Sequence, residues 1–273
     1  MFVASKEDIM TNTWLITGAS TGIGATYADR LARRGHNLIL VARGKAKLDA
    51  LAERLVAETG VAIETLPADL GTSEDLASVE ARLRTDPALS GLVNNAGISG
   101  SAEVASADPD KLEAIIQLNT VALTRLSAAA AAAFSARRSG TIVNTGSVTA
   151  FMAERFEPVY LATKAYVLAF SQALATQLEP AGVRVQVVLP GVTRTPIWAS
   201  ADIDALPSEM VMDVGPMVDA ALAGLDMGER VTIPSLPDIA DWQRFEEARL
   251  ALGPNLSHNR PAGRYVSTRS RAA

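Results

Sequence analysis

The 273-residue chain contains no cysteine and only two histidines, His36 and His258. The absence of cysteine excludes disulfide bonds, thiolate nucleophiles and thiolate metal sites, and it fits a reducing compartment, so we expect a cytoplasmic protein. The two histidines are far apart and belong to no ligand-spaced cluster. A metal site would need carboxylates alone, and we expect none.

Long apolar segments and basic clusters are also lacking. Residues 1–12 form a leader without the apolar centre of a signal peptide, and no apolar run looks long enough to span a bilayer. The net charge of −5 argues against a nucleic-acid partner, because phosphate binding depends on concentrated lysine and arginine. What the chain does have is 48% hydrophobic residues, enough for one large core.

A glycine-rich loop follows the first predicted strand. The apolar run 13–16 is typical of a buried strand, and the helix expected over 25–34 begins directly after the loop. In this context, glycines let the backbone approach a pyrophosphate while the helix start offers free N–H groups. We predict a dinucleotide site, although a structural turn is the alternative, and its expected contacts are Gly18, Ser20, Thr21, Gly22, Ile23 and Gly24.

The residues after the second strand, 37–41, indicate which dinucleotide binds. An acidic side chain there would accept from a ribose 2′-OH, whereas this chain has Ala42 and Arg43. Arginine suits a 2′-phosphate, so we predict NADP; a solvated loop arginine is the alternative. A third strand over 62–66 leads to Asp69 and Leu70, where Asp69 either accepts from the adenine amino group or caps the next helix.

Two small-residue motifs follow later strands. The fourth strand ends in the amide-bearing run 94–97, and we place Asn95 against the cofactor. The apolar run 141–146 ends at Ser147, whose hydroxyl can hold a substrate oxygen. Tyr160 and Lys164 lie four residues apart, so they project from one helix face, where an ammonium can lower the pKa of a phenol toward working pH. Taken alone, that pair is more typical of an ordinary helix.

The whole set resembles the short-chain dehydrogenase/reductase family, over roughly residues 13–195. The matching features are Thr17-Gly18-x-x-x-Gly22-x-Gly24, Asp69, Asn94-Asn95-Ala96-Gly97, Asn119, Ser147, Tyr160-x-x-x-Lys164 and Pro190-Gly191. The resemblance implies that Asn119 bends its helix and exposes a carbonyl to a proton-relay water. It also implies that Thr193 and Thr195 meet the nicotinamide carboxamide and phosphates. From the residues alone, Asn119 can be a helix cap and 190–195 a solvated turn.

Helices 108–118 and 119–138 precede Ser147, and the second contains the alanine run 128–133. Such a narrow surface suits either close packing against another chain or a buried core helix. The family resemblance implies that this helix and the Tyr160 helix pair across a two-fold axis, so we expect a homodimer or homotetramer. Apolar side chains within 196–216 indicate a substrate lid or ordinary packing.

The end of the chain departs from the family pattern, because the usual Asp-Gly-Gly is missing after the strand expected over 230–234. A helix over 239–252 and a basic tail, 254–273, follow, so we place the catalytic domain at 13–253. We expect one doubly wound α/β domain, with a mostly parallel sheet and helices on both faces. The expected activity is hydride transfer between NADP(H) and a carbonyl or secondary alcohol; the alternatives are an NADP sensor without turnover and an enzyme acting on lipids at a membrane surface.

Overall fold

The computed structural model describes residues 13–100, 103–154, 157–198 and 203–265. It divides into two compact units, Met1–Pro234 and Ser235–Ala273. The helix α8 (Ile239–Leu250) belongs to the second unit rather than to the domain expected over 13–253. No described residue after Pro234 is buried, so this helix contributes no core of its own. The leader 1–12 and the end of the tail, 266–273, lie outside the description.

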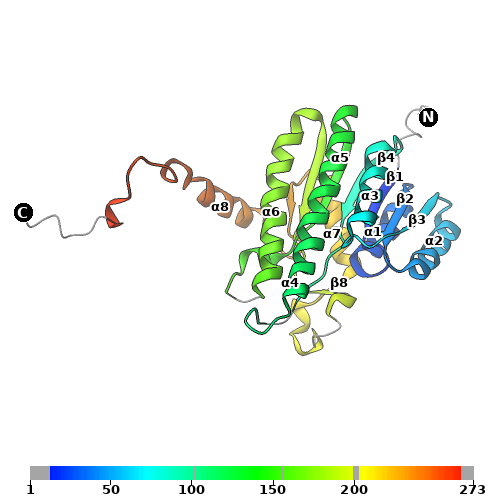
Figure 1. Ribbon diagram of the computed structural model, residues 1–273, viewed down its shortest axis with the longest axis horizontal. Helices are drawn as coiled ribbons and strands as arrows, with labels where there is room; N and C mark the ends of the chain where they lie inside the picture. The colour runs from blue at the N-terminus through cyan, green and yellow to red at the C-terminus, as the bar shows by residue number, and fades with distance from the viewer. Residues whose placement is uncertain (1–12, 101–102, 155–156, 199–202, 266–273) are drawn as a thin grey trace, which may run out of the picture. The chain divides into compact units, whose positions relative to one another are not determined.

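A seven-stranded sheet forms the centre of the first unit, and every neighbouring pair of its strands is parallel (Figure 1). Its spatial order is β3-β2-β1-β4-β5-β6-β9. The strands are β3 (Ile63–Pro67), β2 (Asn37–Ala42), β1 (Thr13–Thr17), β4 (Leu89–Asn94), β5 (Gly140–Thr145), β6 (Val183–Val188) and β9 (Val231–Thr232). The order reverses between β1 and β4, where a doubly wound sheet opens a crevice at its carboxyl edge. The predicted fold class is confirmed.

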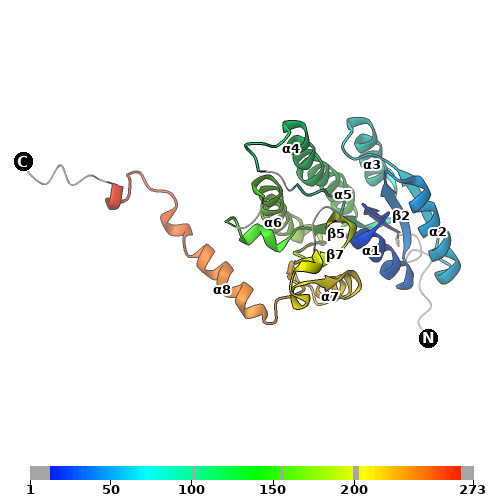
Figure 2. The ribbon, with the colours of Figure 1, turned by 90° about the horizontal axis from the view of Figure 1, so that it is seen from below.

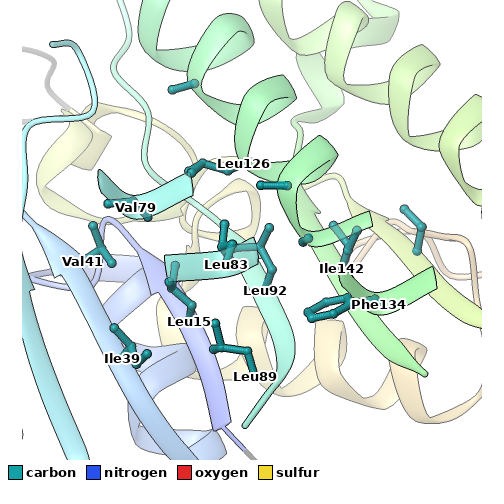
Figure 3. Packing of buried hydrophobic residues seen from close by; sticks show 14 of the residues in the cluster. Leu15, Ile39, Val41, Val79, Leu83, Leu89, Leu92, Leu126, Phe134 and Ile142 are labelled. Atoms are coloured by element: carbon teal, nitrogen blue, oxygen red, sulfur yellow. The ribbon is translucent and has the colours of Figure 1, made fainter. Parts of the chain in front are cut away.

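Helices cover both faces of this sheet, as Figure 2 shows. One face carries α3 (Ser73–Thr85), α5 (Leu123–Arg137) and α6 (Pro158–Leu178); the other carries α1 (Gly22–Arg33), α2 (Lys45–Thr59) and α7 (Val214–Asp226). Strand residues alternate between the two layers. Leu15 belongs to the core cluster that includes residues of α3 and α5 (Figure 3), whereas Ile16 belongs to the cluster that includes residues of α1 and α7. This alternation follows from the two-residue period of a strand. Both faces are therefore apolar, which explains the continuous hydrophobic runs in the sequence.

The two helices expected before Ser147 form one continuous helix. α4 (Pro109–Ile116) passes into a π-helical turn, Gln117–Ala122, and then into α5. By length and composition, the stretch Pro109–Arg137 is apolar enough to cross a membrane, contrary to the expectation from the sequence. Half of its most apolar window is buried inside the fold, however, as in the core helix of a layered domain.

The segment expected to be a lid is only partly separate from the core. The short strands β7 (Thr193–Arg194) and β8 (Met212–Asp213) pair in parallel and bring its two ends together. Between them, Ile197 and Met210 are exposed by 40% and 58%, whereas Met212 packs against the core. The predicted range 196–216 therefore includes packed residues and the first turn of α7. Residues 199–202 lie outside the description.

Candidate active site

A cavity of about 1140 Å³ lies at the carboxyl edge of the sheet. It brings together 14 of the predicted site residues. These are Gly18, Ser20, Thr21, Gly22, Ile23, Arg43, Asp69, Leu70, Asn95, Ser147, Tyr160, Lys164, Thr193 and Thr195. Gly24 and Asn119 are the two predicted residues that do not line the cavity. Both nevertheless contact residues that do.

The glycine-rich loop is packed too closely for side chains at two positions. Gly18 has a φ of +66°, and a Cβ there would lie 2.8 Å from Asn95 Nδ2 and 2.9 Å from Ala96 Cα. A Cβ on Gly24 would lie 2.3 Å from the Gly18 carbonyl oxygen. Asn95 Nδ2 in turn donates to the Thr17 carbonyl at 3.1 Å. Gly24 therefore allows α1 to pack on the loop, whereas Gly18 allows the loop to lie against the end of β4.

The start of α1 is left open to an anion. Its N-cap, Thr21, has an extended backbone and makes no side-chain capping hydrogen bond, and the first turn carries no acidic residue. The first N–H groups of a helix have no partner within the helix, and the dipole makes them attractive to negative charge. Together with the glycine positions, this geometry fits a dinucleotide pyrophosphate.

The two interpretations of Asp69 are now distinguished. Thr72 is the N-cap of α3, and its hydroxyl accepts from the Asp75 backbone N–H at 3.4 Å. Asp69 Oδ1 accepts instead from the Gly71 N–H at 3.0 Å, and the side chain lines the cavity. The capping alternative is therefore wrong, because a threonine nearer the helix occupies that position. The adenine contact stays a prediction.

The helix that carries Tyr160 and Lys164 begins at a well-formed cap. The Glu157 carboxylate accepts from the N–H groups of Val159 at 2.8 Å and Tyr160 at 2.6 Å, and Pro158 occupies the first helical position. Proline is favoured there because its missing N–H would have no helical partner. The cap thus determines where the helix starts, and therefore where Tyr160 lies relative to the cavity.

Tyr160 and Ser147 meet across the cavity. A hydrogen bond links their hydroxyls, and Ser147, only 8% exposed, also accepts from the Thr149 N–H at 3.2 Å. Burial raises the pKa of Tyr160 to about 12, and the hydrogen bond from Ser147 opposes the rise only partly. The phenol is therefore neutral near pH 7 and available as a proton donor.

The pKa of Tyr160 is raised rather than lowered, opposite to the direction expected from the nearby Lys164. Its Nζ lies 5.6 Å from the centroid of the Tyr160 ring and donates to the Thr145 carbonyl at 2.9 Å. Burial lowers the pKa of Lys164 itself to about 8. Desolvation disfavours the charged form of both groups.

Asn119 sits in the π-helical turn and is not a helix cap. Its side chain accepts from the Ile98 N–H at 3.0 Å and donates to the Ile98 carbonyl at 2.9 Å and to Thr163 Oγ1 at 3.1 Å. A Cβ on Gly97 would lie 3.1 Å from Asn119 Oδ1 and 3.8 Å from Lys164 Nζ. The change from α- to π-helical winding lies where the bend is predicted, and the bend itself stays a prediction. Asn119 thus ties the π-helical turn, α6 and the loop after β4 together beside Lys164.

The hydroxyls of Thr193 and Thr195 are engaged within their own loop. Thr193 Oγ1 donates to the Gly191 carbonyl at 3.1 Å, and Thr195 Oγ1 donates to the Thr193 carbonyl at 3.3 Å. Both residues line the cavity, and a Cβ on Gly22 would lie 3.3 Å from the Thr195 side chain. The loop after β6 therefore closes directly over the glycine-rich loop.

Two residues that shape the site were absent from the sequence predictions: Glu157 and Thr163. An acidic residue followed by proline is a known helix-start pattern, so Glu157 was accessible from the sequence. Thr163 was not, because its role depends on meeting Asn119, 44 residues away. Within the described ranges, no group of three or more histidine and carboxylate side chains is placed to hold a metal ion.

A family model and curated relatives both match this chain over most of its length. The model of a family described as short chain dehydrogenase matches residues 12–205. A very-long-chain 3-oxoacyl-CoA reductase of Pyrenophora tritici-repentis is 35% identical over 198 residues, which cover 69% of this chain and 58% of the reductase. This chain therefore spans little more than half the length of that relative. An uncharacterized oxidoreductase of Staphylococcus saprophyticus is 29% identical over 80% of this chain and 93% of its own.

Two solved structures resemble this chain over nearly its whole length. A short-chain dehydrogenase from Sphingobium yanoikuyae, in complex with NADPH, has a TM-score of 0.90 and 51% identity, covering 93% of this chain and 99% of its own. The bulky-bulky ketone specific alcohol dehydrogenase from Comamonas testosteroni has a TM-score of 0.88 and 48% identity, covering 94% and 99%.

Proposed function

The chain belongs to the short chain dehydrogenase family, and from that premise we propose that it transfers a hydride between NADP(H) and the carbonyl or secondary alcohol of an apolar substrate. The observation that carries the proposal is the placement of the hydrogen-bonded Ser147–Tyr160 pair and Lys164 in the cavity that the glycine-rich loop also lines. A proton donor and a dinucleotide site in one cavity are what carbonyl reduction requires.

The residues present fit NADP. The close approach at Gly18 and the open start of α1 suit the pyrophosphate, and Arg43 lines the cavity where the 2′-phosphate would lie. When bound, NADPH supplies the hydride to the carbonyl carbon. The complex of the Sphingobium enzyme with NADPH, at 51% identity, supports this assignment.

Tyr160 would act as the general acid in the reduction direction. Its raised pKa keeps the proton on the phenol until negative charge develops on the substrate oxygen. Ser147 would hold that oxygen, since its hydroxyl already meets the phenol. In alcohol oxidation, Tyr160 must instead accept a proton, and a positive charge on the neighbouring Lys164 would favour the phenolate.

Lys164 and Asn119 would support proton resupply. We assign Lys164 to the ribose of the cofactor as well, because its ammonium lies in the same cavity as the glycine-rich loop. Asn119, held by Ile98 and Thr163, fixes the π-helical turn beside it. In this proposal the exposed helix carbonyl and a water continue the proton route from Lys164 to solvent.

Apolar side chains line part of the cavity, which supports an apolar substrate. They are Ile98, Val148, Val192 and Ile197. A ketone with two large substituents would bury both against such walls. The name of the Comamonas enzyme, specific for bulky-bulky ketones, agrees with this substrate class at 48% identity.

We also propose a homodimer or homotetramer located in the cytoplasm. The alanine run divides between two environments: Ala129 and Ala130 are buried in the core, whereas Ala128 and Ala132 are exposed. Val121 is likewise 36% exposed, so one narrow face of α5 and the turn before it stays available to another chain. A mass of one chain by light scattering at micromolar concentration would contradict this assembly.

The central experiment is NADPH consumption with a panel of ketones that differ in the size of both substituents. We expect turnover with bulky apolar ketones and little with short polar ones. Binding of NADPH without consumption on any carbonyl or alcohol would instead favour an NADP sensor.

A further inference from the structure

Thr149 lies beside Ser147 in the cavity wall, and its hydroxyl is buried without a hydrogen-bond partner among the described residues. The residue is only 5% exposed. It belongs to the 3-10 turn Val148–Phe151, and its own N–H donates to Ser147 Oγ at 3.2 Å. Covalent geometry then keeps the two hydroxyl oxygens within about 7 Å of each other. The Thr149 side chain therefore begins next to the group that we propose to hold the reacting oxygen.

Two other buried threonines of the site do have partners. Thr163 Oγ1 donates to the Tyr160 carbonyl at 2.6 Å, and Thr193 Oγ1 donates to the Gly191 carbonyl at 3.1 Å. A buried hydroxyl without a partner costs free energy that an apolar group of the same shape, such as valine, would not cost. The threonine at position 149 is thus not explained by packing, and its place in the cavity wall points to a ligand.

Thr145 is also a cavity-wall threonine whose hydroxyl lacks a partner in the described structure, but it faces another way. It lies two residues after Val143 on β5, so it shares the strand face that packs toward α1 and α7. Tyr160 comes from α6, on the opposite layer. The unpartnered hydroxyl that adjoins the Ser147–Tyr160 pair is therefore that of Thr149.

The shape of threonine lets this hydroxyl reach a ligand. Rotation about the Cα–Cβ bond by one staggered step exchanges the hydroxyl and the methyl group, which are similar in size. Thr149 can therefore turn its hydroxyl toward the cavity without changing its volume. A hydroxyl both donates and accepts, so it fits a carbonyl or a hydroxyl oxygen.

We propose that Thr149 is a specificity-determining residue whose hydroxyl binds a second substrate oxygen, carried by the carbon next to the reacting carbonyl. The substrate class is then an apolar 1,2-diketone or α-hydroxy ketone rather than a simple ketone. The inference rests on the function proposed above. A substrate with the second oxygen supplies the missing partner, whereas a simple ketone leaves the buried hydroxyl unpaired, and this difference produces the discrimination.

Benzil and deoxybenzoin test the proposal, because they share one apolar skeleton and differ by the second oxygen. The ratio of kcat/KM for benzil to kcat/KM for deoxybenzoin should fall by about 3- to 10-fold in Thr149→Val, as loss of one hydrogen bond implies. Thr149→Ser is the matched control, since it keeps the hydroxyl, and its ratio should stay within about twofold of wild type. Comparing ratios removes the different reactivity of the two ketones and any loss of active enzyme.

Stability provides a second readout that a hydroxyl with a structural role would not give. The melting temperature of Thr149→Val without ligands should equal or exceed that of wild type, because no hydrogen bond is lost. A clear fall would show that the hydroxyl is bonded within the fold, and an unchanged ratio would exclude Thr149 from recognition; either result overturns the inference.

The outcome for the proposed function is separate. Turnover of other ketones but not of benzil would overturn the inference and leave the function standing. Absence of NADPH consumption by wild type with every ketone and alcohol would refute the function itself.

Discussion

The pKa values of two groups of side chains are shifted by different causes: in one group the shifts favour the neutral forms, and in the other they favour the charged forms. In the cavity, burial raises the pKa of Tyr160 and lowers that of Lys164, so both shifts favour the neutral form. On α1, burial acts to raise the pKa of Asp29, but hydrogen bonds from Arg33 and Arg30 lower it, so the charged form is favoured. The pKa of Arg30 is raised by Asp219 and Asp29.

The difference lies in what each charge can pair with. Asp29, with a side chain 12% exposed, meets Arg30 at 2.7 Å and Arg33 at 3.2 Å, so its charge is compensated where it is partly desolvated. Among the described residues, by contrast, Lys164 donates to the Thr145 carbonyl and Tyr160 is hydrogen-bonded to the Ser147 hydroxyl, and neither has a charged partner. The groups that we propose to exchange protons are thus desolvated and without counter-ions, whereas the groups that join helices are paired.

The largest expected effect is on turnover in Tyr160→Phe. General acid catalysis is typically worth about 10²- to 10⁴-fold, and the Ser147 hydroxyl is a poorer proton donor than the phenol. NADPH affinity and melting temperature should change little, because one hydroxyl is lost. Tyr166→Phe is the control: it removes an exposed phenol, bonded to Thr124 at 2.7 Å, from the same helix. Near-full turnover of Tyr160→Phe would show that the proton donor is misassigned.

Lys164→Met should separate function from stability. We expect turnover to fall by at least about tenfold and NADPH to bind more weakly, because the ribose contact is lost. At pH 7 the free energy of unfolding should change by less than about 1 kcal/mol, because removing a buried charge offsets the loss of the hydrogen bond to Thr145.

The pH dependence of stability sharpens the same test. Because burial lowers the pKa of Lys164 from 10.5 to about 8, the unfolded chain holds this proton at higher pH than the folded one. Wild-type stability should therefore gain a rising contribution between about pH 8 and pH 10, which Lys164→Met lacks. Above pH 10, the raised pKa of Tyr160 acts in the opposite direction. Identical profiles for the two proteins in urea unfolding would contradict the assignment.

A smaller effect is expected at Asp29. Asp29→Asn removes the carboxylate that Arg30, Arg33 and Arg54 share, and should destabilise the fold by about 1 to 3 kcal/mol at pH 7. Since the pKa of Asp29 is lowered in the fold, its contribution is present above the ordinary carboxyl pKa and is lost as the pH falls through the folded value. Denaturant titrations of both proteins should converge in acid; a constant difference would exclude this mechanism.

The smallest effect on stability is expected at Asp219, the more exposed carboxylate that also binds Arg30. Asp219 is 55% exposed in its side chain and meets Arg30 Nε at 2.7 Å, joining α7 to α1. Asp219→Asn should cost no more than about 1 kcal/mol and less in high salt, as exposed pairs usually do. A loss as large as that of Asp29→Asn would remove the distinction between the partly buried and the exposed pair.

Most element types and their order were predictable because their signals are local, although the helix α7 was not among the predictions. The strand runs, the glycine loop and the helix around Tyr160 follow from periodicity and turn residues within short windows. Helix continuity was less accessible: nothing near Asn119 distinguishes a cap from a π-helical turn, since the turn is held by Ile98 and Thr163 from other parts of the chain. The first-unit boundary at Pro234 also escaped, because the helix pattern of 239–252 does not reveal whether that helix has a core to join.

By itself, the sequence determined the parallel sheet, the glycine-lined loop, and the spacing that sets Ser147, Tyr160 and Lys164 at one edge. These depend on backbone conformation and on neighbours along the chain. The tertiary structure alone decided the signs of the pKa shifts. Desolvation and ion pairing are sums over groups distant in sequence, such as Thr145 beneath Lys164, so they exist only once the chain has folded.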